Sequence, residues 1–135
     1  MNIWKYILVI LTPALSANAQ LNVAVSPVKT IGQKAVVRLS LTNNLAEPIE
    51  SARAVCFLLD DQGKMVGQST KWVIGGTKDQ PSLQPKTGTI FNFVMTSPQP
   101  FTTTNLTTQV SFSRLVVDGG KLANPKTDVQ IQNAK

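Results

Sequence analysis

The chemically reactive side chains of this chain are few. The sequence has no histidine and a single cysteine, Cys56, among its 135 residues. Without histidine, the Ser-His-Asp and Cys-His arrangements of nucleophilic catalysis cannot form, and the commonest metal ligand is missing. The adjacent carboxylates Asp60 and Asp61 remain as a pair that could act as general acid and base. These carboxylates and the Cys56 thiol are therefore the two candidates for enzyme chemistry.

Asp60 and Asp61 have the pattern of turn residues. They precede Gln62 and Gly63, and aspartates at such positions commonly bond their own backbone in a tight turn. Neighbouring side chains at a strand end point apart, which does not suit two carboxyls that must share a proton. The pair also lacks the spaced carboxylates of a calcium loop. The pattern predicts a turn, with no catalytic and no metal-binding residue.

Cys56 lies between Val55 and Phe57 in a run that reads as a strand. No histidine can lower its pKa, so we expect a buried small hydrophobe rather than a reactive thiol. A soft copper site with Met65 and Met95 is the other possibility, but the spacing of the three residues does not favour one. We expect no cofactor.

Short strands dominate the pattern after the first 20 residues. Alternating runs rich in valine, isoleucine, threonine and phenylalanine lie between turn residues, while helical periodicity is weak. These runs predict an all-β fold, an immunoglobulin-like sandwich of about seven strands in two antiparallel sheets. An open barrel is the alternative. The expected strands are 21–25, 37–42, 51–59, 69–74, 87–95, 110–117, 121–122 and 129–131.

Two kinds of connection separate these strands. Residues 60–63 and 118–120 carry hairpin-turn signals, because each group joins aspartate with glycine. Residues 75–85 and 96–108 predict longer links rich in proline and polar side chains. The second link contains Asn105-Leu106-Thr107, a glycosylation sequon that matters only in a eukaryotic host.

The expected strand 51–59 is apolar on both faces. One face carries Ala54, Cys56 and Leu58, and the other carries Val55, Phe57 and Leu59. A large apolar face left open usually marks an interaction surface. Either the loop 75–85 or a partner protein is therefore expected to cover the second face.

Trp72, Phe57 and Lys71 are the candidates for contact with a partner. Trp72 is the only tryptophan outside the first 19 residues, and it follows Lys71 directly. We expect Trp72 in the core, and a surface anchor for a partner is the alternative, since tryptophan often anchors interfaces. No catalytic, cofactor-binding or metal-binding residue accompanies these three candidates.

The first 19 residues have the pattern of a secretory signal. Lys5 precedes an apolar run over 6–11, and Ala17-Asn18-Ala19 fits the small-residue cleavage rule, which places cleavage between Ala19 and Gln20. A membrane span needs roughly 20 apolar residues, whereas Pro13 interrupts this run. No cysteine lies directly after the run, where a bacterial lipid anchor would attach. We expect one exported domain, residues 20–135, soluble in the periplasm or outside the cell.

The positive charge is dispersed along the chain. The formal net charge is +6, of which Lys5 contributes one, so residues 20–135 carry +5. The basic residues form no run and no aromatic-interleaved stripe, so a nucleic-acid partner is not expected. A single cysteine cannot form an intramolecular disulfide, so packing alone must stabilise the domain.

The stretch 37–93 carries a series of short motifs. Leu41-Thr42-Asn43-Asn44 and Glu47-Pro48-Ile49 form an asparagine-containing turn, and a strand with Leu58 and Asp60 leads to a glycine turn with Gly63 and Val66. Leu83-Gln84-Pro85 and Phe91 form a later segment. In the order of these motifs, the stretch resembles the FxLYD family of small exported domains. Cys56, Leu59 and Lys86 stand where the family has phenylalanine, tyrosine and often glycine. The resemblance implies a sandwich fold and an accessory role in a bacterial cell envelope.

We expect a non-enzymatic module that acts by contact with another envelope or extracellular protein. A carrier of a small or polyanionic ligand on the basic surface is one alternative. An enzyme that uses carboxylates or Cys56 is the other. The sequence leaves the identity of the partner and the oligomeric state open.

Iodoacetamide labelling tests the expected burial of Cys56. The native protein should react much more slowly than the denatured protein, because a buried thiol is neither accessible nor ionised. Mass spectrometry of the alkylated chain measures the two rates. Fast labelling of the native protein would contradict the burial of Cys56 and favour the thiol-enzyme alternative.

Overall fold

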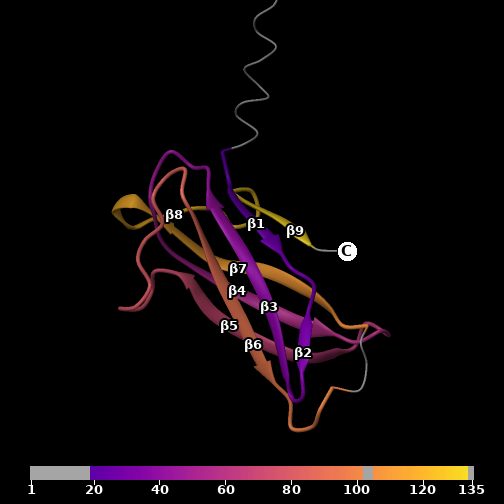
Figure 1. The fold of residues 1–135 in the computed structure, drawn as a ribbon. Helices are drawn as coiled ribbons and strands as arrows, with labels where there is room; N and C mark the ends of the chain where they lie inside the picture. Colours follow the sequence, from indigo (N-terminus) through magenta and orange to yellow (C-terminus); the bar gives the residue numbers. More distant parts are fainter. Residues whose placement is uncertain (1–18, 102–104, 134–135) are drawn as a thin grey trace, which may run out of the picture.

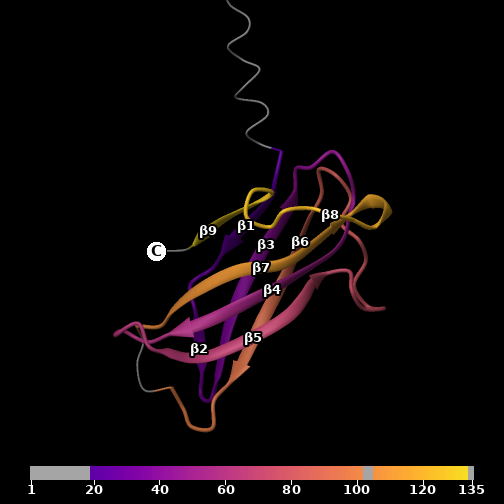
Figure 2. The same ribbon diagram turned by 180° about the vertical axis from the view of Figure 1, so that it is seen from behind.

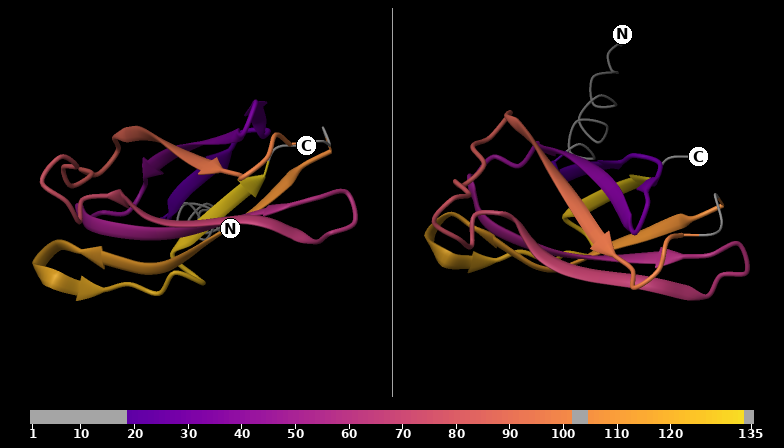
Figure 3. Two further views of the ribbon diagram at one scale, coloured as in Figure 1. Left: turned by 90° about the horizontal axis from the view of Figure 1, so that it is seen from below. Right: turned by 60° about the horizontal axis from the view of Figure 1, so that its bottom comes forward.

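Two β-sheets stacked face to face form the fold (Figures 1 and 3). The computed structural model describes residues 19–101 and 105–133. The predicted signal therefore lies, except for Ala19, outside the described residues. No helix in the described ranges is long and apolar enough to cross a membrane. The strands are β1 (Leu21–Val25), β2 (Lys29–Ile31), β3 (Lys34–Asn43), β4 (Ile49–Leu59), β5 (Met65–Ile74), β6 (Gly88–Thr96), β7 (Thr107–Val117), β8 (Lys121–Leu122) and β9 (Val129–Asn133).

The five-stranded sheet is built around β3. β1 and β2 pair with one edge of β3, β6 pairs with the other, and β9 adds beside β1. Buried and exposed residues alternate along β3, as expected for a strand with one face on the core and one in water. This alternation is why the sequence pattern predicted the strand.

The four-stranded sheet has the order β5-β4-β7-β8 and lies nearer the viewer in Figure 2. β4 and β5 form the predicted hairpin. The Asp60 carboxylate accepts hydrogen bonds from the backbone N–H groups of Gln62 and Lys64, both at 2.9 Å. Gly63 has a φ of 80°, a backbone conformation that glycine adopts without strain. The short 3₁₀ turn η3 (Asp118–Gly120) joins β7 to β8.

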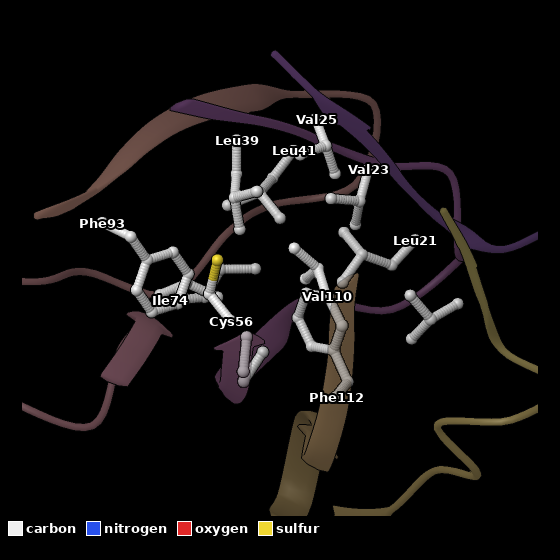
Figure 4. Packing of buried hydrophobic residues seen from close by; sticks show 14 of the residues in the cluster. Leu21, Val23, Val25, Leu39, Leu41, Cys56, Ile74, Phe93, Val110 and Phe112 are labelled. Carbon is white, nitrogen blue, oxygen red and sulfur yellow. The ribbon is translucent and has the colours of Figure 1, made fainter. Parts of the chain in front are cut away.

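The core lies between the two sheets (Figure 4). Alternate side chains of β1 and β3 meet those of β4 and β7 there, with Phe93 of β6 and Ile74 of β5. The sulfur of Cys56 lies among these apolar side chains. Among the described residues, the only buried polar side chain is that of Asn43.

Three details differ from the sequence prediction. β2 was not predicted, because all three of its residues are exposed and give no alternating pattern. β7 begins at Thr107, inside the predicted link 96–108, and pairs with β4 along its whole length. β9 pairs with β1 in parallel, so the prediction of purely antiparallel sheets is wrong for this pair. Parallel pairing joins segments distant in sequence, which local patterns do not reveal.

Asn43 ties two connections to the end of β3. Its Nδ2 donates to the carbonyl oxygens of Glu47 and Leu83, both at 3.0 Å, and its Oδ1 accepts from the Leu45 N–H at 2.9 Å. Its backbone N–H donates to the Thr87 oxygen, and its carbonyl accepts from the Lys86 N–H. The amide thus fixes both the β3–β4 turn and the loop that leads into β6.

Replacing Asn43 tests this role. Asn43→Ala removes the partners of two carbonyls and one N–H, so we expect the free energy of unfolding to fall by about 2–4 kcal/mol. Urea denaturation measures the change. The control Asn92→Ala, at an exposed position of β6, should stay within about 0.5 kcal/mol of wild type. Equal losses in the two variants would contradict the role of Asn43.

Candidate functional site

Phe57 and Trp72 lie on the outer face of the four-stranded sheet. Phe57 alternates with the buried residues Cys56 and Leu58, and Trp72 pairs with the exposed Arg53. Both aromatic side chains are half-buried, and neither belongs to the core cluster. The expectation that placed Trp72 in the core is therefore wrong.

Lys71 does not join the two aromatic residues. It pairs with Ala54, whose side chain faces the core, so Lys71 is on the opposite face of β5 from Trp72. Its side chain is exposed because β5 is the edge strand of its sheet. Lys71 therefore lies apart from Trp72 and Phe57, and its contact with a partner stays a prediction.

We call the apolar outer surface of β4 and β5 the contact face, and it consists of Val55, Phe57, Leu59 and Trp72. All four are half-buried, and none belongs to the core cluster or to the partly buried residues that pack against it. The outer face of β4 therefore remains apolar, as the sequence predicted. Such a face on a sheet is a candidate interaction surface.

The loop 75–85 contacts the beginning of β4 rather than its middle. Leu83 forms a bridge with Ile49. A Cβ on Gly75 would lie 1.9 Å from the Glu50 oxygen, and a Cβ on Gly76 would lie 2.4 Å from the Trp72 ring. The loop therefore packs against the Trp72 end of the contact face. Phe57 and Leu59 lie farther along β4, beyond these loop contacts. The prediction that the loop covers the outer face of this strand is therefore wrong for Phe57 and Leu59.

Two β-bulges meet at Arg53. Between β4 and β5, Ile74 pairs with Ala52 and Trp72 pairs with Arg53, which leaves Val73 as an extra residue. Between β4 and β7, Arg114 pairs with Arg53 and Phe112 pairs with Ala54, which leaves Ser113 as an extra residue. Each bulge resets the alternation of side chains.

The result is a row of Trp72, Arg53 and Arg114 across three strands, which we call the arginine row. The Arg53 guanidinium carbon lies 5.9 Å from the centre of the Trp72 ring, a cation–π contact. The Ser113 hydroxyl donates to the Arg53 carbonyl at 3.4 Å and spans the bulge. Sequence reasoning missed both arginines, because strand register and bulges brought them together.

The residues considered for enzyme chemistry are not assembled into a site. The Asp60 carboxylate is engaged in its turn. Met95 is buried, whereas Met65 is 51% exposed, so the soft ligands considered for copper do not converge. No group of three or more histidine, cysteine, aspartate or glutamate side chains in the described parts of the chain could hold a metal ion.

A shallow groove of about 380 Å³ lies on the outer face of the other sheet. Lys29 and Arg38 provide its positive charge, and Val28 and Val36 provide apolar walls. This groove is separate from the contact face, because it is lined by β2, β3 and β6 and the segment that precedes β2.

Two solved structures are similar to this fold. An X-ray structure of the Northeast Structural Genomics Consortium target SoR45 is 15% identical over 79% of this chain and 81% of its own, with a TM-score of 0.57. The crystal structure of the putative ApaA protein from Bordetella pertussis is 16% identical over 77% of this chain and 86% of its own, with a TM-score of 0.52. At these identities the likeness shows the fold alone. No family model and no curated relative matches the chain.

Burial raises the pKa of the Cys56 thiol to about 11, and this predicts a pH effect. An unfolded thiol ionises near roughly pH 8.5, so above that pH the unfolded state binds fewer protons than the folded state. The free energy of unfolding then falls as pH rises. Relative to Cys56→Ala, the wild type should lose about 2.5 kcal/mol of stability between about pH 8.5 and pH 11. Urea denaturation across this range measures it, and identical pH profiles would contradict the raised pKa.

Proposed function

We propose that this chain is an exported, non-catalytic module that acts by contact with another protein through the contact face. The observation that carries the proposal is the apolar outer face of β4, where Val55, Phe57 and Leu59 remain half-buried outside the core. A few side chains near the centre of an interface, tryptophan prominent among them, supply most of the binding energy, and the apolar side chains around them exclude water.

We further propose that the sandwich is of the immunoglobulin-like type and related to FxLYD domains. The order β5-β4-β7-β8 in one sheet and the pairing of β3 with β6 in the other support an immunoglobulin-like arrangement. Lys86 stands where the family often has glycine, and its φ of 63° is a conformation that glycine adopts readily. The predicted signal over residues 1–19 supports a location in the periplasm or outside a bacterial cell.

A second candidate function is the binding of a small anionic ligand in the groove on the other sheet. Lys29 and Arg38 line that groove together with apolar side chains. This combination suits an anion with an apolar portion.

Photo-crosslinking in the producing cells tests the contact face. With p-benzoylphenylalanine at position 57, we expect a crosslinked species heavier than the monomer, because Phe57 would lie against the partner. The matched control places the same residue at position 90, where Ile90 is 57% exposed on the other sheet. Gel electrophoresis and mass spectrometry detect the products. Crosslinking at position 90 but not at position 57 would contradict the proposal.

A further inference from the structure

We propose that the arginine row docks an acidic segment of a partner protein, with a partner carboxylate lying between the guanidinium groups of Arg53 and Arg114. This inference rests on the proposed function, because the row lies on the same sheet face as Phe57. It adds the chemistry by which the partner would be recognised.

The strand register brings the two arginines opposite each other. Arg53 and Arg114 are direct cross-strand partners, and both side chains are exposed. Like charges directly opposite each other destabilise a sheet. A carboxylate placed between them removes this repulsion, and guanidinium groups bind carboxylates through paired hydrogen bonds. The arrangement therefore favours an anion at this position.

Within the described residues, the two arginines have no carboxylate partner. Among residues 19–101 and 105–133, the one ion pair joins Lys121 to Glu47. Neither guanidinium of the arginine row has an acidic side chain at ion-pair distance in these ranges. The charge of the row is therefore available to a partner, in a chain whose net charge is +6.

Two bulges and the Trp72 ring hold the arginine row in place. The bulge at Val73 brings Trp72 opposite Arg53, and the bulge at Ser113 keeps Arg114 outward while Phe112 enters the core. The Trp72 ring contacts Arg53 on one side and Gly76 on another, where a side chain would clash. Bulges commonly re-aim side chains toward a binding site. The row is thus partly preorganised for a ligand.

The position of the apolar residues defines the rest of the partner segment. Phe57 lies four residues from Arg53 on the same face of β4, about 13 Å along the strand. An extended segment that places a carboxylate at the arginines would place an apolar side chain near Phe57. An acidic segment with interspersed apolar residues fits both features.

The probe is a fluorescein-labelled serine-based peptide that carries one glutamate with a leucine four residues before and four residues after it, so that these three side chains share one face when the peptide is extended. In the control peptide, glutamine replaces the glutamate. Fluorescence anisotropy with the full chain should show binding of the glutamate peptide that weakens as ionic strength rises. The double variant R53Q/R114Q should weaken binding by at least roughly tenfold. The matched variant K29Q/R38Q loses the same charge from the groove on the other sheet and should change binding by less than about twofold.

Four results of the peptide-binding experiment would overturn the proposal. They are no binding of the glutamate peptide, equal binding of both peptides, retained affinity in R53Q/R114Q, and equal loss in the two double variants. Heparin binding that depends on these arginines while the peptide does not bind would indicate a glycan partner instead. Circular dichroism and thermal melting check the fold of each variant. R53Q/R114Q should melt close to wild type, because relief of the repulsion between the two arginines offsets loss of the contact between Arg53 and Trp72.

Crosslinking at position 57 separates this inference from the proposed function. If R53Q/R114Q crosslinks as well as the wild type, the acidic docking fails and contact through the face stands. If neither protein crosslinks at position 57, the proposed function itself fails. Loss of crosslinking in R53Q/R114Q, together with retained crosslinking in K29Q/R38Q, supports both the acidic docking and the contact through the face.

Discussion

The buried amide of Asn43 is the interaction on which the arrangement of the loops depends. Its side chain bonds to Leu45, Glu47 and Leu83, so it joins the β3–β4 turn to the loop that enters β6. Every donor and acceptor of a buried amide must find a partner, since each unpaired group would cost free energy. With Leu83 fixed there, the preceding loop packs against the beginning of β4 and against Trp72. One buried polar group thus links the two sheets to the candidate site.

The rest of the stability comes from packing. Cys56 is a free, buried thiol, so within the described parts of the chain no disulfide supports the sandwich. Alternating side chains from the two sheets fill the core, as Figure 4 shows. Because the core uses one face of each sheet, the outer faces are free to differ. One carries the contact face and the arginine row, and the other carries a groove with Lys29 and Arg38.

The two bulges connect packing to recognition. A regular ladder could not keep Phe112 in the core while also placing Arg114 opposite Arg53, because side chains alternate strictly along a strand. One extra residue in β7 satisfies both requirements, and one in β5 brings Trp72 into the same row. The core therefore keeps its apolar side chains while charged and aromatic groups gather on the surface.

The sequence by itself determined the local features. Alternation predicted most strands, the Asp60 turn followed from turn chemistry, and Cys56 was expected inside because its neighbours are apolar and no base is present. Only the tertiary structure decided the parallel pairing of β1 with β9, the partners of Asn43 and the row of Trp72, Arg53 and Arg114. These features depend on strand register between distant segments. A single inserted residue changes which side chains meet, and no local pattern records where the partner strand will lie.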